Sequence, residues 1–190
     1  MRAFVLTGTP GTGKTSLSSR LVEAIPLSVI RVNDLAAGER LYSEYDAARD
    51  TYVVDLEKTA KRITEIVSAL SKRTLIEGHL AHLVTPRKLV GTALVLRCNP
   101  VVLGERLRAK GFQPAKVREN MLAELLDVCL VEAIRSYGEK KVAEIDTTRK
   151  TPDEVLEEAL SVFLEGKRQL YVVDWIAELE AQGALSELLD

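Results

Sequence analysis

The sequence has few of the residues that build metal clusters and disulfide frameworks. Only two of its 190 residues are cysteines and two are histidines. Cys98 and Cys129 lie among apolar residues and belong to no CxxC or Cys/His motif, so we expect reduced core thiols. The two histidines are too few for a zinc site.

Long hydrophobic runs are also missing. No segment is long and apolar enough to span a membrane, and residues 1–6 lead straight into a glycine loop without the pattern of a signal peptide. We therefore expect a cytoplasmic protein. The net charge of -2 provides no overall positive field that would draw the chain onto nucleic acid.

The remaining pattern is that of one α/β domain. Five short apolar runs predict strands at 3–7, 28–32, 74–77, 93–97 and 142–145. Helical segments are predicted at 14–25, 57–72, 101–110, 117–137 and 152–164, with an amphipathic stretch at 171–189 that breaks near Gly183. This alternation favours a parallel sheet covered by helices on both faces.

Three local features are also predicted. Asn33 or Asp34 can cap a short helix, and Thr151 is well placed to cap the helix that starts at Pro152. Residues 42–55 are polar and aromatic without a clear period, so we expect a partly irregular insert.

A phosphate-binding loop lies between the first strand and the first helix. Residues 8–15 read GTPGTGKT and match GxxxxGK[ST] in full, in the strand–loop–helix context that confirms the motif. Glycines let backbone N–H groups approach anionic oxygens, Lys14 can reach the β- and γ-phosphates, and the Thr15 hydroxyl can bind Mg²⁺. The nucleotide-binding residues expected here are Gly8, Pro10, Gly11, Thr12, Gly13, Lys14, Thr15 and Ser16.

Two further candidates follow the third predicted strand. Glu77 ends that strand and is the best candidate for the acid that holds the magnesium or its water; the alternative is an ordinary exposed acid. His79 lies where it can touch the γ-phosphate or an attacking water, although a loop histidine is often a packed or solvated group.

A series of short motifs resembles one family. After the phosphate loop come NDLA at 33–36, LY at 41–42, YD at 45–46, EGH at 77–79, VLR at 95–97, ERL at 105–107, KGF at 110–112 and KVREN at 116–120. In order and spacing, from about residue 3 to 165, they resemble the adenylate kinase–like ATPases of small-subunit ribosome assembly, whose human member is the coilin-interacting nuclear ATPase protein. The absence of a nuclear context suggests an archaeal-type member.

The resemblance implies a P-loop fold with a core, a nucleoside-monophosphate-binding insert and a short lid. The core is expected at 1–32, 56–107 and 119–166, the insert at 33–55, the lid at 108–118, and a C-terminal helical extension at 167–190. It further implies Mg²⁺-dependent transfer of the γ-phosphoryl group of ATP to AMP, slow ATP hydrolysis, and a ribosomal protein of the small-subunit platform as partner.

Roles for residues outside the phosphate loop follow from this resemblance. Arg106 is expected to meet the transferring phosphoryl group, and Lys110 to bind the nucleotide from the lid, where the family often has arginine. Asp34 and Arg40 are expected to contact AMP. Arg106 as a surface charge and Asp34 as a helix cap remain open alternatives.

Competing functions also remain open. The chain could be a nucleotide-switched assembly factor with little kinase activity, or a small kinase for another acceptor. The apolar stripe of residues 171–189 fits either core packing or a partner surface.

Overall fold

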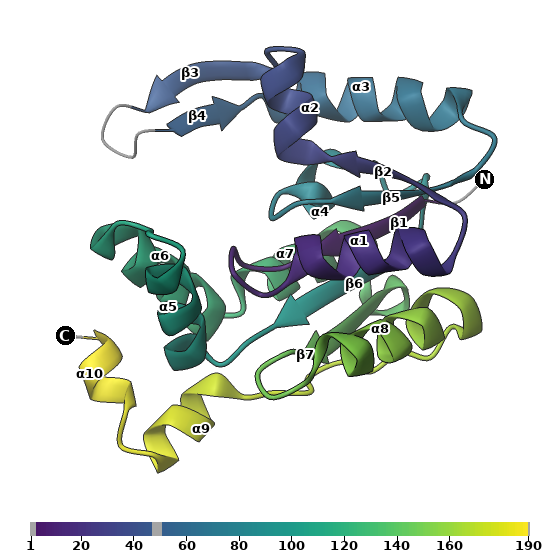
Figure 1. The fold of residues 1–190 in the computed structure, drawn as a ribbon. Helices are drawn as coiled ribbons and strands as arrows, with labels where there is room; N and C mark the ends of the chain where they lie inside the picture. Colours follow the sequence, from purple (N-terminus) through teal and green to yellow (C-terminus); the bar gives the residue numbers. More distant parts are fainter. Residues whose placement is uncertain (1–2, 47–50, 190) are drawn as a thin grey trace.

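A five-stranded parallel sheet forms the centre of the protein (Figure 1). The computed structural model describes residues 3–46 and 51–189. The strand order is β2-β5-β1-β6-β7, with β1 at Ala3–Thr7, β2 at Leu27–Arg31, β5 at Arg73–Glu77, β6 at Val90–Arg97 and β7 at Val142–Asp146. All five predicted strands and their parallel arrangement are confirmed.

Helices cover both faces of this sheet, because alternate strand residues point to opposite sides. Phe4 and Leu6 pack with helices α1 (Lys14–Ala24) and α8 (Pro152–Leu160). Ala3 and Val5 pack on the other face with α3 (Leu56–Ala69), α4 (Ala81–Val84) and α7 (Val128–Tyr137). The two-sided burial explains why the strands read as continuous apolar runs.

The predicted insert contains regular structure. Helix α2 (Val32–Gly38) is followed by the antiparallel strands β3 (Tyr42–Asp46) and β4 (Thr51–Val54), so the prediction of partly irregular structure for 42–55 is wrong over these strands. The rings of Tyr42 and Tyr52 stack at 4.3 Å across the pair, and such cross-strand contacts stabilise paired strands. Residues 47–50 of the predicted insert lie outside the described residues.

The predicted cap of α2 is also wrong. The helix begins at Val32 with Arg31 in the cap position, and no side chain caps it. Asn33 and Asp34 therefore lie within the first turn instead of before it.

Two helices replace the single long helix predicted at 117–137. They are α6 (Pro114–Leu125) and α7, which are separated by a break at Leu126 and Asp127. Helix α5 (Pro100–Ala109) precedes α6. Asp127 has φ 54, in the left-handed region, and its carboxylate pairs with Arg97. The two helices pack on different parts of the molecule, because Leu125 of α6 packs on the C-terminal helices and Leu130 of α7 packs on the sheet.

After α8 the chain passes beside β7, where the Gln169 carbonyl accepts a hydrogen bond from the Glu144 N–H, and its last helices pack on α6 (Figure 1). The 3-10 helix η1 (Glu139–Lys141) leads into β7, and α8 starts with the predicted Thr151 cap, now a reciprocal capping box with Glu154. A π-helical turn, η2 (Ser161–Glu165), follows α8, then come α9 (Trp175–Ala181) and α10 (Leu185–Leu189). The predicted break near Gly183 is confirmed, whereas residues 171–174 are not helical. Among the described residues, no helix has the length and apolar character needed to cross a membrane.

Candidate nucleotide-binding site

The glycine loop joins the end of β1 to the start of α1. Gly8, Gly11 and Gly13 have φ values of 134°, 94° and 103°, which non-glycine residues rarely adopt. A Cβ atom on Gly8 would lie 2.4 Å from the Leu96 carbonyl oxygen of β6. Glycine at this position therefore lets the loop pass directly over the neighbouring strand.

Lys14 lies across the loop that it belongs to. Its amino group donates hydrogen bonds to the carbonyl oxygens of Gly8, at 2.7 Å, and Thr9, at 2.9 Å. Burial lowers the pKa of Lys14 to about 8. The charge is thus held by two carbonyl groups in a poorly solvated place, where an anionic phosphate would be a stronger partner.

Glu77 faces the phosphate loop at the carboxyl end of β5. Its carboxylate accepts hydrogen bonds from the hydroxyls of Thr15 and Ser18, both at 2.7 Å. It is buried, and Arg31 approaches it at 3.4 Å from the end of β2. The alternative of an ordinary exposed acid does not fit this arrangement.

Sequence reasoning missed Ser18 and Arg31. Ser18 is one helical turn after Thr15, so the helix places both hydroxyls on the side of Glu77. Arg31 is the register partner of Glu77 in the parallel pair β2–β5. Both positions follow from element periodicity once the strand order is known, and the strand order was the missing information.

The two histidines occupy different environments. His79 is partly buried beside the loop, and desolvation, with the Lys14 charge as the next cause, lowers its pKa to about 4. His82, given no role from the sequence, is buried, with Nδ1 2.7 Å from the Thr7 hydroxyl and Nε2 2.9 Å from Glu132. Burial lowers the pKa of His82 as well. His79 is therefore a neutral side chain at neutral pH.

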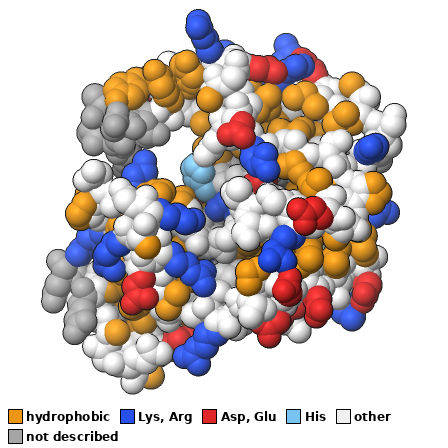
Figure 2. Space-filling model, viewed as in Figure 1, with side chains coloured by type: hydrophobic (Ala, Val, Ile, Leu, Met, Phe, Trp, Pro, Cys, Tyr) orange, Lys and Arg blue, Asp and Glu red, His pale blue; other side chains and the backbone are white. Residues whose placement is uncertain are grey.

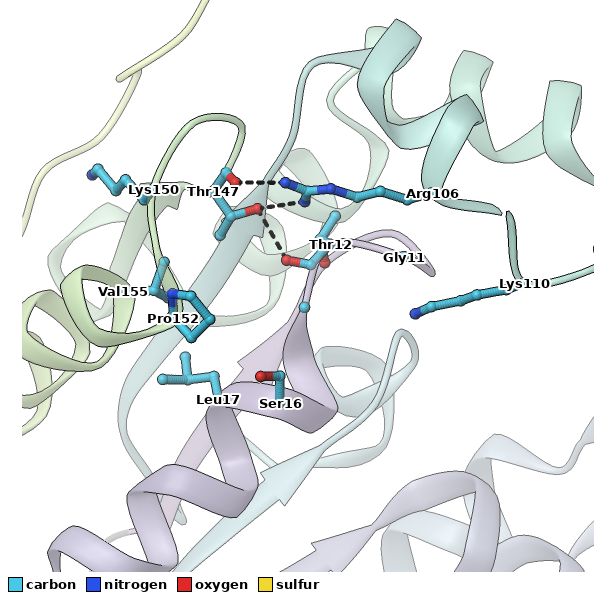
Figure 3. Close-up of a pocket in the computed structure, with 11 residues that line it drawn as sticks. Gly11, Thr12, Ser16, Leu17, Arg106, Lys110, Thr147, Lys150, Pro152 and Val155 are labelled. Atoms are coloured by element: carbon cyan, nitrogen blue, oxygen red, sulfur yellow. Dashed lines mark hydrogen bonds between the residues drawn. The ribbon is translucent and has the colours of Figure 1, made fainter. Parts of the chain in front are cut away.

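A pocket of about 250 Å³ lies beside the loop (Figure 3). Gly11, Thr12, Gly13 and Ser16 form one side and Lys110 reaches toward it, while Leu17, Pro152 and Val155 supply apolar wall. Thr147 and Lys150, which sequence reasoning missed, follow β7 and complete the lining. Their position at the carboxyl end of a parallel strand is the signal that could have identified them.

Arg106 also lines this pocket. Its guanidinium donates to the carbonyl oxygens of Thr147, at 2.9 Å, and Thr148, at 3.2 Å. The Thr147 hydroxyl donates in turn to the Thr12 carbonyl at 3.0 Å. Arg106 is thus held close to the phosphate loop by the strand-end segment of β7.

A hollow opens on the other side of the loop (Figure 2). Lys and Arg side chains gather on the side of this hollow formed by α5 and α6, and the strands β3 and β4 lie on its opposite side. Asp34 in α2 and Arg40 after it are exposed, and α2 packs on the strand-end turn, because a Cβ on Gly78 would lie 3.0 Å from Val32 Cβ.

This fold and loop define a P-loop protein of the small-molecule kinase type. Residues 5–127 match the family model described as an AAA domain. The shikimate kinase of Bacteroides thetaiotaomicron superposes with a TM-score of 0.58 at 20% identity, over 86% of this chain and 98% of that one, which supports the fold alone.

Other proteins have much higher sequence identity with this chain than the shikimate kinase has. A protein of Methanocaldococcus jannaschii named "Putative adenylate kinase" is 41% identical over 172 residues, 90% of this chain and 92% of its own length. One of the same name from Archaeoglobus fulgidus is 41% identical over 183 residues, 93% of each chain. The chain belongs to this archaeal adenylate kinase family.

Proposed function

We propose that the protein is an Mg²⁺-dependent adenylate kinase that transfers the γ-phosphoryl group of ATP to AMP and forms two ADP. The observation that carries the proposal is the contact of the Thr15 hydroxyl with the Glu77 carboxylate, 2.7 Å apart, next to the buried amino group of Lys14. A hydroxyl, an acid and a lysine around a glycine loop are the components that phosphoryl transfer uses to position and neutralise the phosphates.

The donor nucleotide fits along the phosphate loop. Its β- and γ-phosphates would draw Lys14 from the Gly8 and Thr9 carbonyls, and the base would enter the 250 Å³ pocket beside Leu17 and Pro152. The amide groups of the loop and the N-terminus of α1 would bind the remaining phosphate oxygens.

Thr15 and Glu77 fit an Mg²⁺ ion. Among the described residues no cluster of three or more acidic, histidine or cysteine side chains could hold a metal by itself. Mg²⁺ does not need such a cluster, because it keeps several waters and takes phosphate oxygens as ligands. When bound it would neutralise charge on the β- and γ-phosphates; Ser18 and Arg31 would keep Glu77 oriented toward it.

The acceptor would enter the hollow on the other side of Glu77. We assign residues 33–55 as its binding insert, with Asp34 and Arg40 as contacts, and residues 108–118 as a lid that carries Lys110. Arg106 would move from the carbonyls of Thr147 and Thr148 toward the transferring group. Neutral His79 could then donate a hydrogen bond to the γ-phosphate without adding charge. A closed lid would exclude water and favour AMP over hydrolysis.

A second candidate is a nucleotide-switched factor in maturation of the small ribosomal subunit, with a platform ribosomal protein as partner. An observation that favours it is the set of exposed apolar side chains around the α6–α7 break: Leu126, Val128 and Val131 are 60%, 36% and 38% exposed. Apolar residues grouped in this way are typical of a protein-binding surface.

The test compares acceptors. Initial rates of ADP formation are measured with Mg-ATP alone and with AMP, GMP, CMP or UMP, and Lys14→Ala is the control. The proposal predicts that AMP raises ADP formation far above the rate of ATP hydrolysis and that the other monophosphates do so less. Equal ATP consumption with and without every monophosphate would exclude the kinase and favour the switch.

A further inference from the structure

The C-terminal segment reaches the back of the phosphate loop through a buried charge cluster. Arg97 lies at the end of β6, and its Nε and Nη1 atoms are 2.8 Å from Glu124 of α6 and 2.6 Å from Glu144 of β7. The side chains of Arg97 and Glu124 are 2% exposed and that of Glu144 is 0% exposed. One buried cation thus faces two buried carboxylates, with Asp127 as a half-exposed third partner.

This excess of negative charge has to be stabilised by neutral donors, because a buried carboxylate without hydrogen bonds is costly. Glu124 receives one from the Thr9 hydroxyl, at 2.5 Å, and one from the Trp175 indole N–H, at 3.2 Å. The Cys98 N–H donates a third, also at 3.2 Å. Glu144 receives a hydrogen bond from the backbone N–H of Tyr171.

Glu124 therefore joins the two ends of the domain. Thr9 is the second residue of the phosphate loop, and its carbonyl accepts hydrogen bonds from Lys14 and from the Thr12 hydroxyl, both at 2.9 Å. Trp175 is the first residue of α9, and it packs with Leu179 against Leu125 of α6. Trp175 is thus connected to Lys14 through Glu124, which holds the Thr9 hydroxyl, and through Thr9, whose carbonyl holds Lys14.

We infer that Trp175 is a positioning residue for ATP binding, and that docking of residues 169–179 and occupation of the phosphate loop are thermodynamically coupled through Glu124. Two carboxylate residues of the cluster hold this segment. Glu124 accepts from Trp175, and the Glu144 N–H donates to the Gln169 carbonyl at 2.9 Å. When phosphate replaces Thr9 as the partner of Lys14, the loop changes its contacts at the residue that Glu124 holds. The linkage is reciprocal: a partner that binds the detached segment would weaken ATP binding, and ATP would weaken binding of that partner by the same factor. The inference rests on the ATP half of the proposed function and not on the acceptor.

The test uses Trp175→Phe, which removes the N–H donor and keeps an apolar ring. Calorimetric titration with ATP is expected to show a dissociation constant raised about threefold to tenfold. This range assumes that a hydrogen bond to a charged group is lost and that only part of its free energy affects ATP binding. Ile176→Ala is the matched control, since Ile176 is the next residue of α9 and 46% exposed. An unchanged dissociation constant in a folded Trp175→Phe variant would overturn the inference.

A double-mutant cycle and an intrinsic probe complete the test. With Thr9→Val as the second change, the double variant should bind ATP no more weakly than Thr9→Val alone, whereas additive effects would contradict a shared path.

Trp175 is the one tryptophan of the sequence, so its fluorescence emission reports on this contact in the unaltered protein. ATP should change that emission, and constant emission through a titration that calorimetry shows to saturate would overturn the coupling. A coupled protein that failed to phosphorylate AMP would support this inference and exclude the proposed acceptor.

Discussion

The Thr15 hydroxyl and the Glu77 carboxylate meet at 2.7 Å, although they lie on different elements, α1 and β5. If this pair positions Mg²⁺, Glu77→Gln should raise the Mg²⁺ concentration for half-maximal activity about 10- to 100-fold. Thr15→Ser keeps a hydroxyl and should change it little. Magnesium titrations of ADP formation measure both; identical curves for Glu77→Gln and the unaltered protein would exclude the role.

Lys14 provides the test of the phosphate site itself. Lys14→Ala should lower the rate constant of phosphoryl transfer by roughly 100-fold or more, because the charge that neutralises the transferring group is lost. Lys72→Ala removes an exposed lysine just before the amino end of β5 and serves as the matched control. Steady-state kinetics of the two variants would refute the assignment if both retained normal rates.

The depressed pKa of Lys14 predicts a pH dependence of binding. In the free protein Lys14 loses its proton near pH 8, whereas bound phosphate favours the charged form. ATP binding should therefore take up a proton above pH 8, and the dissociation constant should rise by about tenfold per pH unit there. Calorimetry from pH 7 to 9.5 measures this rise, and a constant affinity over that range would be evidence against it.

The glycines of the loop differ in what their substitution should cost. Gly8→Ala forces a Cβ into the Leu96 carbonyl oxygen and should lower the free energy of unfolding by roughly 2–4 kcal/mol. A Cβ on Gly13 meets no atom within 4 Å, so Gly13→Ala should cost about 1–2 kcal/mol, from its backbone conformation alone. Urea unfolding gives both values, and an equal loss would contradict the close approach of loop and strand.

Acid should destabilise the fold through its histidines. Burial lowers the pKa of His79 and His82 below the unfolded value of 6.5. The unfolded chain therefore binds more protons below pH 6.5, and the free energy of unfolding falls as the pH drops toward 4. His79→Gln and His82→Gln should each flatten this decline in urea unfolding at pH 5, 6 and 7. An undiminished decline in both variants would show that other groups cause it.

The core of the fold could be predicted from the sequence because its signals are local. Runs such as 3–7 and 93–97 become parallel strands, and GTPGTGKT specifies its own loop between strand and helix. The β3–β4 pair could not be predicted, because its pairing depends on contacts such as Tyr42 with Tyr52. The break at Asp127 depends on the distant Arg97 in the same way.

The candidate site divides similarly. Lys14, Thr15 and Glu77 follow from a motif and a strand end, and the structure brings them together. Glu124 and Trp175 could not be found from the sequence, since a glutamate on a helix with several charged residues and a tryptophan in an amphipathic tail resemble ordinary surface and core residues. The contact of Glu124 with Thr9 depends on the strand order, and that of Trp175 with Glu124 depends on the path of the C-terminal segment.

The most direct test of the central claim follows the γ-phosphate of ATP. The protein is incubated with Mg²⁺, AMP and ATP labelled at the γ-phosphate, and the products are separated by chromatography. The account predicts that the label appears in the β-phosphate of ADP, with two ADP formed for each ATP consumed, and that Lys14→Ala abolishes this transfer. Label released only as inorganic phosphate, at a rate that AMP does not change, would contradict it.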